Sequence, residues 1–517
     1  MSAFALAIVM LCAPAHASRG DQPAVLVPQI LAAYDLATHA DDVQTIETVG
    51  TIAGSGLTGA FHSWRDGENE RDDESLGVRR ETSLKLGSRL FVRDSSGNVR
   101  ELRGYLKRRS LTGDFIDSGA FLKAPERSKF LGYGTVAGHR AWRLEVNAVG
   151  GEPQTMWIET DSGLPARLEY LDGDGPTTID RSDWRDVAGH KIAFRSVVSD
   201  GERQFDQTEI TTAVTIDKPI EATVFAPLVN RTLRADGVQT VPLVASGQHI
   251  AVKVAINDRP LLFLLDTGAQ SVLLDTNVAK ALNLPEAGAL EVRGATRAGG
   301  LHILTVPRIT IGTGALDDLV ATSLDLQGAS GGAVRLDGIL GYPFFASSLV
   351  ELDFAHSAMR FGAPGSFAPR GVKVELDLDR GLVEAPFVVN ATVRAPFIVD
   401  TGNSGELLLY RAFIDRYPGV VPRSTTTALN FGIGGSTNTY RTALDALDLG
   451  GVALYHRVVD VVLTKKGAFG DQVDAGNVGL GVLRNFVVTF DLANSAMYLE
   501  KGDAFDDGRR RAVTTSP

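Results

Sequence analysis

Apolar and polar residues alternate with a period of two along much of the first half of the chain. Residues 83–86, 142–146 and 166–170 are examples in which every second side chain is apolar. This alternation predicts β-strands that bury one face and expose the other. Near the start, residues 29–40 follow the helical period instead and predict a short amphipathic helix. We therefore expect a β-rich domain over residues 20–235.

The second half of the chain contains longer apolar runs that end in the same tripeptide. Residues 262–265 and 396–399 are apolar, and Asp-Thr-Gly follows directly at 266–268 and at 400–402. An ionisable side chain at the end of a buried strand is costly unless it is paired. Two such carboxyls in matched settings predict that they meet and share one proton.

Similar elements follow each tripeptide. Short helices are predicted at residues 276–284 and 410–417, and each ends before a proline, which cannot continue a helix. Glycine-rich segments come next, at residues 293–300 and 431–435, and they are candidates for hairpin turns. The order of elements is therefore the same after both copies.

The similarity between the two copies extends further along the chain. Residues 337–341 match residues 477–481, and residues 351–359 match residues 489–497. The offset between copies is 134 residues at the tripeptides, 140 at the glycine motifs and 138 at the last segment. Landmarks in the same order at a nearly constant offset indicate one structural unit that is used twice.

These repeated motifs resemble those of the aspartic peptidases, most closely the retropepsin-like group, with two units fused in one chain as in pepsin-like enzymes. The resemblance covers roughly residues 245–500. It implies an all-β fold with a few short helices, in which two β-barrel lobes occupy residues 240–368 and 369–502. A curved antiparallel sheet would precede them.

The resemblance also implies roles for particular residues. Asp266 and Asp400 would be the catalytic pair of an endopeptidase, with one carboxyl activating a water and the other polarising the peptide carbonyl. Thr267 and Thr401 would hold the base of this pair rigid. Glycines are implied around the pair and in the flaps that cover substrate: Gly268, Gly402, Gly341 and Gly481 at the pair, and Gly299, Gly300, Gly434 and Gly435 in the flaps.

One position departs from the family pattern. After Asp-Thr-Gly the family usually has Ala, Ser or Thr; Ala269 fits, but Asn403 does not. An amide side chain there would either donate a hydrogen bond to Asp400 or disturb the site by its size. The pH optimum therefore stays open.

Composition excludes several other classes of function. The net charge is −11, and no basic block with interleaved aromatic residues is present, which argues against binding of nucleic acid. The nine histidines do not show the spacing of metal ligands, so we expect no metal and no other cofactor. Beyond the N-terminal leader, no apolar stretch approaches the length of about 18 residues that spans a bilayer, so no stable membrane span is expected.

Residues 1–17 resemble a secretory signal. The apolar run 4–13 is short and is followed by Ala-His-Ala at 15–17, although no Lys or Arg precedes it. The single cysteine, Cys12, lies in this segment, so the mature chain would contain no disulfide. We expect a secreted protein, in the bacterial periplasm.

The part of the chain before the repeat differs in composition. All four tryptophans precede residue 190, which indicates a separate domain with a boundary near residues 225–239. This domain weakly resembles the periplasmic lipoprotein-carrier fold, through residues 156–160 and 214–227. Its role stays open between a scaffold without a ligand and a site for a hydrophobic ligand or a peptide.

Two functions follow from these patterns. The first is an endopeptidase whose substrate is a protein or peptide. The alternative is a non-catalytic periplasmic protein that binds lipid or peptide and uses the peptidase fold as a clamp. Residues 503–517 contain three consecutive arginines at 509–511 and end in Thr-Ser-Pro, and we expect them to be disordered.

Overall fold

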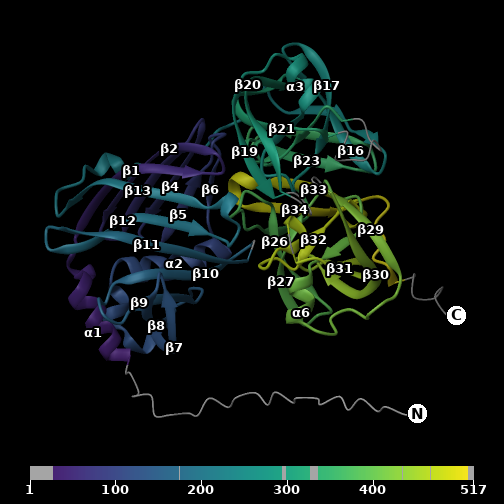
Figure 1. Cartoon of the computed structure of the whole chain (residues 1–517). Helices are drawn as coiled ribbons and strands as arrows, with labels where there is room; N and C mark the ends of the chain where they lie inside the picture. Colours follow the sequence, from purple (N-terminus) through teal and green to yellow (C-terminus); the bar gives the residue numbers. More distant parts are fainter. Residues whose placement is uncertain are drawn as a thin grey trace, which may run out of the picture.

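The computed structural model describes residues 27–173, 175–293, 298–326, 336–432, 435–465 and 467–509. It consists of an N-terminal sheet domain and two β lobes, which lie side by side in Figure 1. The mainly β architecture with a few short helices is confirmed. The proposed leader, residues 1–17 with Cys12, lies outside the described residues.

The N-terminal domain is built on one antiparallel sheet of 13 strands. Two meanders, β1 to β6 and β7 to β13, join where β1 pairs with β13. The strands are β1 (Thr45–Gly54), β2 (Leu57–Asp66), β3 (Asn69–Leu76), β4 (Arg79–Leu86), β5 (Arg89–Arg93), β6 (Val99–Glu101), β7 (Ser128–Val136), β8 (His139–Val146), β9 (Gln154–Glu159), β10 (Pro165–Asp172), β11 (Gly175–Val187), β12 (His190–Ser199) and β13 (Gln207–Ile216).

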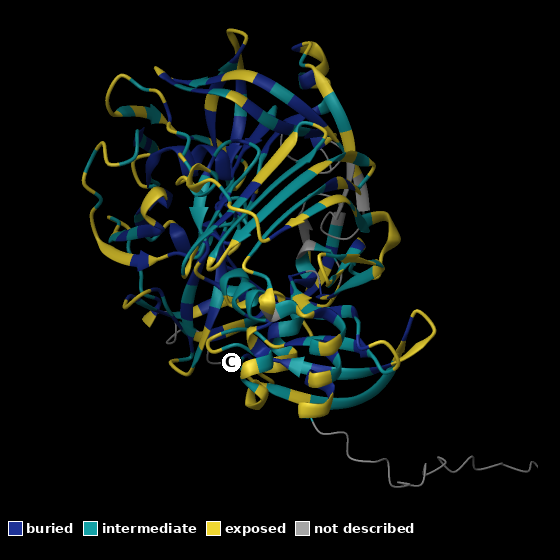
Figure 2. Ribbon diagram, turned by 90° about the vertical axis from the view of Figure 1, so that its left-hand side faces the viewer, coloured by how far each residue is buried: buried dark blue, intermediate teal, exposed yellow. Residues whose placement is uncertain are grey.

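Two helices pack on this sheet and form its core. They are α1 (Val27–Thr38), which matches the helix predicted from the sequence, and α2 (Tyr105–Asp117). Ile30 and Tyr34 of α1 pack with Ile116 of α2 and with Leu144 of the sheet. Away from this cluster, the strands β2 and β3 are mostly half-buried, and Figure 2 shows much of this sheet in teal and yellow.

Lobe 1 is a closed ring of six strands. The ring runs β16-β17-β22-β18-β21-β20, and pairing of β20 with β16 closes it. The helices α3 (Thr276–Ala281) and α5 (Tyr342–Ser347) flank it. The strands are β16 (His249–Ile256), β17 (Arg259–Leu265), β18 (Val272–Asp275), β20 (Ala298–Ile311), β21 (Gly314–Leu324) and β22 (Gly338–Leu340), with β15 (Val244–Ser246) and β19 (Glu286–Arg293) as extensions.

Lobe 2 repeats this connectivity. Its ring runs β26-β27-β32-β28-β31-β30, and pairing of β30 with β26 closes it. The short helices are α6 (Arg411–Arg416) and α7 (Leu480–Leu483). The strands are β26 (Glu384–Val389), β27 (Val393–Val399), β28 (Leu407–Leu409), β30 (Gly435–Asp448), β31 (Ala453–Val462) and β32 (Gly476–Val478), with β29 (Thr427–Gly432) as an extension.

A six-stranded sheet joins the lobes along their symmetry axis. Its order is β14-β24-β23-β33-β34-β25, and the two central strands are antiparallel. Glu351 of β23 lies opposite Thr489 of β33, and these are matching positions of the sequence repeat. The pseudo-twofold axis therefore passes between them. The strands are β14 (Gln239–Pro242), β23 (Leu349–Asp353), β24 (Ala358–Gly362), β25 (Val372–Glu375), β33 (Phe486–Asp491) and β34 (Ala496–Lys501).

Part of the C-terminal segment that we expected to be disordered is packed. Phe505 contacts Phe486 with ring centroids 5.6 Å apart, and the Tyr455 N–H donates to the Asp507 carbonyl at 2.7 Å. Residues 503–509 thus belong to lobe 2, because their aromatic and backbone groups find partners there. Residues 510–517 lie outside the described residues.

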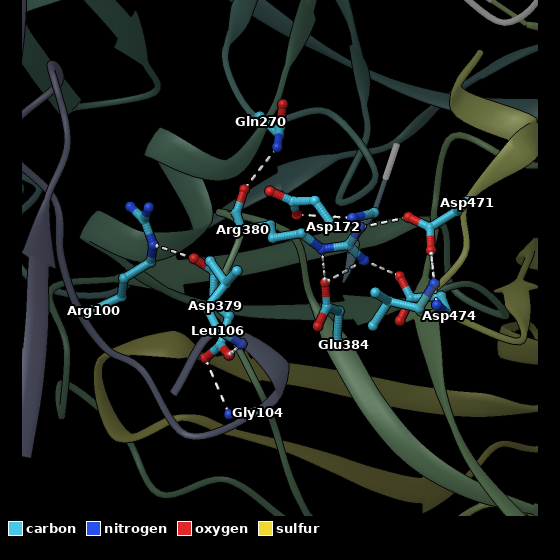
Figure 3. Close-up of polar contacts among 12 residues, drawn as sticks. Arg100, Gly104, Leu106, Asp172, Gln270, Asp379, Arg380, Glu384, Asp471 and Asp474 are labelled. Atoms are coloured by element: carbon cyan, nitrogen blue, oxygen red, sulfur yellow. Dashed lines mark hydrogen bonds and ion pairs between the residues drawn. The ribbon is translucent and has the colours of Figure 1, made fainter. Parts of the chain in front are cut away.

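The N-terminal domain contacts lobe 2 through buried polar groups, which Figure 3 shows. Asp379 precedes β26, and its carboxylate accepts hydrogen bonds from the first N–H groups of α2, including Leu106 at 2.8 Å. The neighbouring Arg380 forms ion pairs with Glu384, Asp471 and Asp474. The N-terminal domain and lobe 2 therefore share a buried polar interface. The difference in composition between them predicts two domains but does not reveal this contact.

Candidate active site

Asp266 and Asp400 occupy matching turns at the ends of β17 and β27. The backbone N–H of Asp266 donates to the Leu340 carbonyl at 3.2 Å, and that of Asp400 donates to the Val478 carbonyl at 2.9 Å. The two carboxyl groups lie within interaction range of each other, and each lies against the glycine of the opposite tripeptide. Protein surrounds both side chains, yet each residue keeps some surface accessible to solvent. The structure thus brings the two predicted catalytic residues close together.

The glycines of the two tripeptides lie against the opposite carboxyl group. The Gly268 N–H donates to Asp266 Oδ1 at 2.8 Å, and the Gly402 N–H donates to Asp400 Oδ1 at 2.9 Å. A Cβ atom at Gly268 would lie 2.7 Å from Asp400 Oδ1, and one at Gly402 would lie 2.5 Å from both carboxylate oxygens of Asp266. Because real Cβ contacts are not this short, a side chain at either position would push the carboxyls apart.

The threonines of the tripeptides lock the base of the pair. Both are fully buried, and the backbone N–H of each donates to the hydroxyl of the other at 3.0 Å. The Thr267 hydroxyl donates to the Val399 carbonyl at 2.6 Å, and the Thr401 hydroxyl donates to the Leu265 carbonyl at 2.9 Å. Each threonine therefore binds the strand that carries the other aspartate, which fixes the two lobes relative to each other.

The two carboxyl groups are hydrogen-bonded differently. Asp400 Oδ1 accepts from the backbone N–H groups of Gly402 and Asn403, the latter at 3.0 Å. Asp400 Oδ2 accepts from the side-chain amide of Asn477 at 2.7 Å. For Asp266, the stabilising donors are the backbone N–H groups of Gly268 and Ala269. The pair is thus asymmetric although the scaffold is repeated.

This asymmetry acts on the ionisation of the pair. Burial, followed by the charge of Asp400, raises the pKa of Asp266 well above its ordinary value. Burial also raises the pKa of Asp400, but the Asn403 N–H, Asp266, the Gly402 N–H and Asn477 oppose this rise. Two interacting carboxyls lose their protons in two separate steps. The arrangement therefore favours one shared proton, with the negative charge on Asp400.

The side chain of Asn403, the residue that departs from the family pattern, contributes indirectly. Its Oδ1 accepts from the Gly405 N–H at 2.8 Å, and its Nδ2 donates to Asn477 Oδ1 at 3.4 Å. Both polar atoms of this side chain are thus used away from Asp400. Asn477, which the sequence marks only as part of the repeat, supplies the side-chain donor.

The strand register corrects one detail of the sequence alignment. Leu265 of β17 lies opposite Leu340 of β22, and Val399 of β27 lies opposite Val478 of β32. The residues that follow, Gly341 and Gly479, are therefore equivalent, and each directly precedes a helix. Gly481 lies two positions later, inside α7, where a Cβ atom would lie 2.7 Å from Glu406 Cγ.

Two further titratable side chains lie near Asp400. His249, at the start of β16 in lobe 1, lies near the backbone of Gly402, and its burial lowers its pKa. Tyr410 follows β28 and is buried, which raises its pKa well above the ordinary value. No spacing rule in the sequence connects His249 with the tripeptide of the other lobe, so sequence reasoning misses it.

Hairpins occur at both predicted flap positions. In lobe 1, Gly299 and Gly300 of β20 pair with Val292 and Glu291 of β19. In lobe 2, Gly435 of β30 pairs with Gly432 of β29. The predicted flap residue Gly434 lies outside the described residues. That these hairpins cover a substrate stays a prediction.

Among the described residues, no group of three or more His, Cys, Asp or Glu side chains is arranged to hold a metal ion. In the same part of the chain, every helix is too short or too polar to cross a bilayer.

Comparison with known proteins identifies the first lobe. Residues 252–344 match the model of the aspartyl protease family. This segment contains Asp266, five of the six ring strands of lobe 1 and most of the sixth, β16, so the resemblance in the sequence is confirmed there. Among curated proteins, none is significantly similar to the chain.

Solved structures provide similarities to other proteins. A DUF1329 family protein from Desulfovibrio piger is 18% identical, with a TM-score of 0.28, over 38% of this chain and 96% of its own. A putative outer membrane lipoprotein-sorting protein domain from Vibrio parahaemolyticus is 12% identical, with a TM-score of 0.28, over 38% and 95%. A LolA superfamily protein from Nitrosomonas europaea is 15% identical, with a TM-score of 0.30, over 40% and 99%.

Proposed function

We propose that this protein is an aspartic endopeptidase and that Asp266 and Asp400 are its catalytic residues. The observation that carries the proposal is the close pair of buried carboxyl groups in matching turns of two lobes. The family match over residues 252–344 supports a protease-like function for the lobe that carries Asp266. Two carboxyls that share a proton provide a base and an acid at one place.

In the proposed reaction, the ionised Asp400 accepts a proton from a water molecule, and the oxygen of that water attacks the peptide carbonyl carbon. Asp266 donates its proton to the carbonyl oxygen, which gives a neutral tetrahedral diol. Asp400 then passes its proton to the amide nitrogen, and the C–N bond breaks. Asp266 recovers a proton from a hydroxyl of the diol, so that the acid and amine products leave the pair as it began.

The rigidity of the pair supports this mechanism. The reciprocal hydrogen bonds of Thr267 and Thr401 join the two lobes directly beneath the carboxyls. Groups that are already placed for the transition state need no reorganisation during the reaction, which is a large part of the rate enhancement in many enzymes. We also propose that the enzyme acts outside the cytoplasm, because residues 1–17 have the pattern of a secretory signal.

The alternative role, binding of a ligand by the N-terminal domain, stays a prediction. Two cavities on its described sheet have volumes of about 170 and 220 Å³. They are smaller than the range of about 300–1,000 Å³ that is typical of ligand pockets. The larger one is lined by Phe61 together with polar side chains such as Ser63, Asp72 and Glu209. These features favour the endopeptidase as the main function.

The experiment compares Asp266→Asn and Asp400→Asn with the wild-type mature chain. Cleavage of denatured casein is measured by the release of new amino termini across a range of pH. We expect each variant to lose at least about 1,000-fold in rate while its circular dichroism spectrum is unchanged, because the pair works as a unit. Asp445→Asn is the matched control, since it makes the same change at an exposed position of β30.

The outcome is decisive in both directions. A folded variant of either aspartate that keeps more than a few per cent of the wild-type rate would overturn the proposed mechanism. A wild-type chain that cleaves no unfolded protein at any pH would instead favour the binding role.

A further inference from the structure

The two carboxyls of the pair differ in one side-chain contact. Asn477 lies on β32 and donates its Nδ2 hydrogen to Asp400 Oδ2 at 2.7 Å. On this strand Asn477 lies opposite Ile398, and in lobe 1 Ile339 lies opposite Leu264 in the same register. The residue of lobe 1 that is equivalent to Asn477 is therefore Ile339, which has no polar group. The repeated scaffold thus places an amide beside one aspartate and a hydrocarbon side chain beside the other.

Neighbouring groups fix the orientation of the Asn477 amide. Its Oδ1 accepts from Asn403 Nδ2 at 3.4 Å, and Asn403 Oδ1 accepts from the Gly405 N–H at 2.8 Å. Since the oxygen of each amide is occupied by a donor, its NH₂ group must face the next acceptor. The chain of hydrogen bonds therefore runs from Gly405 through both asparagines and ends on Asp400.

This arrangement suits a carboxylate better than a carboxylic acid at Asp400. The two backbone donors at Oδ1 and the amide at Oδ2 supply hydrogens to both oxygens. Hydrogen bonds of this kind stabilise the ionised form. At Asp266, the buried side chains of Leu264 and Ile339 belong to an apolar cluster that adjoins the tripeptide. A proton is therefore held more readily there.

We propose that Asn477 is a positioning residue that holds Asp400 as the base of the pair and leaves the proton on Asp266. The inference rests on the proposed peptidase function and adds the assignment of roles within the pair. Asn477 itself touches Asp400 and is not required to contact the reacting water. Asn403 acts one step further away, through the orientation of Asn477.

The charged and titratable groups that face Asp400 do not explain why Asp400 is ionised and Asp266 keeps the proton. They are Asp266 from the opposite lobe, His249 from β16 and Tyr410 from the end of β28. Burial lowers the pKa of His249 and raises that of Tyr410, so both side chains are uncharged near neutral pH. The hydrogen-bond donors thus distinguish the two carboxyls.

The test is the pH profile of kcat/KM for cleavage of a fluorogenic peptide by the full mature chain. The acidic limb of this profile reports ionisation of the base. In Asn477→Leu the donor is replaced by a side chain like that of Ile339. We expect the acidic limb to move up by about one pH unit, which lowers activity on that limb about tenfold. A residue that only supports the fold would lower activity at every pH and leave the limb in place.

Two further variants keep the test decisive. Asn403→Ala removes the group that orients Asn477 but keeps the donor, so we expect a smaller shift in the same direction. The double variant Asn477→Ile and Ile339→Asn moves the donor to Asp266, and we expect the acidic limb to return toward its wild-type position with the roles exchanged. If Asn477→Leu fails to fold, the position of the acidic limb in the pH profile of Asn403→Ala decides the question.

An unshifted acidic limb in a folded Asn477→Leu variant, or in Asn403→Ala where the former does not fold, overturns the assignment of Asn477. This failure is distinct from failure of the peptidase function. In the latter case Asp266→Asn and Asp400→Asn would keep their activity, or the wild-type chain would have none to measure.

Discussion

The two lobes follow the same chain path but differ at the positions closest to the carboxyl pair. Both are closed rings of six strands, and their threonines make the same hydrogen bonds across the axis. Lobe 1 places Ala269 and Ile339 beside its aspartate, whereas lobe 2 places Asn403 and Asn477 there. A repeated scaffold therefore supplies matched positions, while the division into acid and base comes from local substitutions.

The lobes also differ in how they meet the N-terminal domain. Lobe 1 makes a neutral contact, in which buried Asn98 donates to the Ser347 hydroxyl at 2.7 Å. Lobe 2 uses a charged group, since the carboxylate of Asp379 accepts from N–H groups at the start of α2, whereas the neighbouring Arg380 forms its ion pairs with three carboxylates inside lobe 2. The Arg380 carbonyl also accepts from Gln270 of the lobe 1 tripeptide loop at 2.7 Å, as Figure 3 shows. One short segment thus contacts both lobes and the N-terminal domain.

The largest effect that we expect comes from Arg380→Met, which removes the cation of this cluster. Glu384, Asp471 and Asp474 are then left without their common partner, and an unpaired buried charge costs about 3–5 kcal/mol. The free energy of unfolding is measured in urea by far-UV circular dichroism. The exposed pair of lobe 2 between Arg411 and Asp415 provides the control Arg411→Met, for which we expect about 1 kcal/mol or less.

This loss of stability should depend on pH. Burial raises the pKa of Asp474 to about 7 and that of Glu384 well above its ordinary value, even with the arginine in place. Acids whose pKa is raised by folding take up protons in the folded state as pH falls, so stability is lost as pH rises. We therefore expect the destabilisation by Arg380→Met to be larger at pH 8 than at pH 5. Equal losses at both pH values would show that the carboxylates are not buried together.

A second prediction compares the glycines on either side of the axis. In Gly402→Ala the added methyl carbon would lie within 2.5 Å of all three carboxyl atoms of Asp266. In Gly268→Ala it would lie 2.7 Å or more from the carboxyl atoms of Asp400. We expect kcat/KM to fall about 100-fold in both variants, and further in Gly402→Ala, because a displacement of about 1 Å has an effect of this size. Gly113→Ala in α2 is the control, since its nearest neighbour would lie at 3.8 Å. An active Gly402→Ala variant would contradict the close packing of the pair.

The smallest effect concerns the two contacts with the N-terminal domain. Asp379→Ala removes the acceptor of several N–H groups at the start of α2, and we expect a loss of about 1–2 kcal/mol. Ser347→Ala in lobe 1 removes one neutral acceptor, and we expect about 1 kcal/mol. Tryptophan fluorescence reports this domain, because all four tryptophans precede residue 190. If Ser347→Ala lost more stability than Asp379→Ala, lobe 1 and not lobe 2 would make the stronger contact with the N-terminal domain.

Much of the fold and of the candidate site was accessible from local sequence patterns. An apolar run that ends in Asp-Thr-Gly predicts a buried strand and a polar turn, and the structure has β17 and β27 there. Pro285 and Pro418 predicted where the two short helices stop, and α3 and α6 end before these prolines. Such features depend on residues close together in the chain, so their signal is present in any short window.

Other features depend on which strands pair. The sequence contains glycines at both 479 and 481, and counting from the repeat selects Gly481, whereas pairing of β27 with β32 makes Gly479 the equivalent of Gly341. The contact between Asn477 and Asp400 joins residues 77 positions apart. It exists only because the same pairing places their strands side by side.

The sequence by itself determined that one unit occurs twice and that two aspartates end buried strands, since burial and turn formation are local properties of the chain. Only the tertiary structure decided that the two aspartates are unequal and that the short segment of Asp379 and Arg380 contacts both the N-terminal domain and lobe 1. The physical reason is that a hydrogen bond or a buried ion pair depends on atoms within about 3 Å. Which atoms come this close is determined by the register of strands that are far apart in the chain.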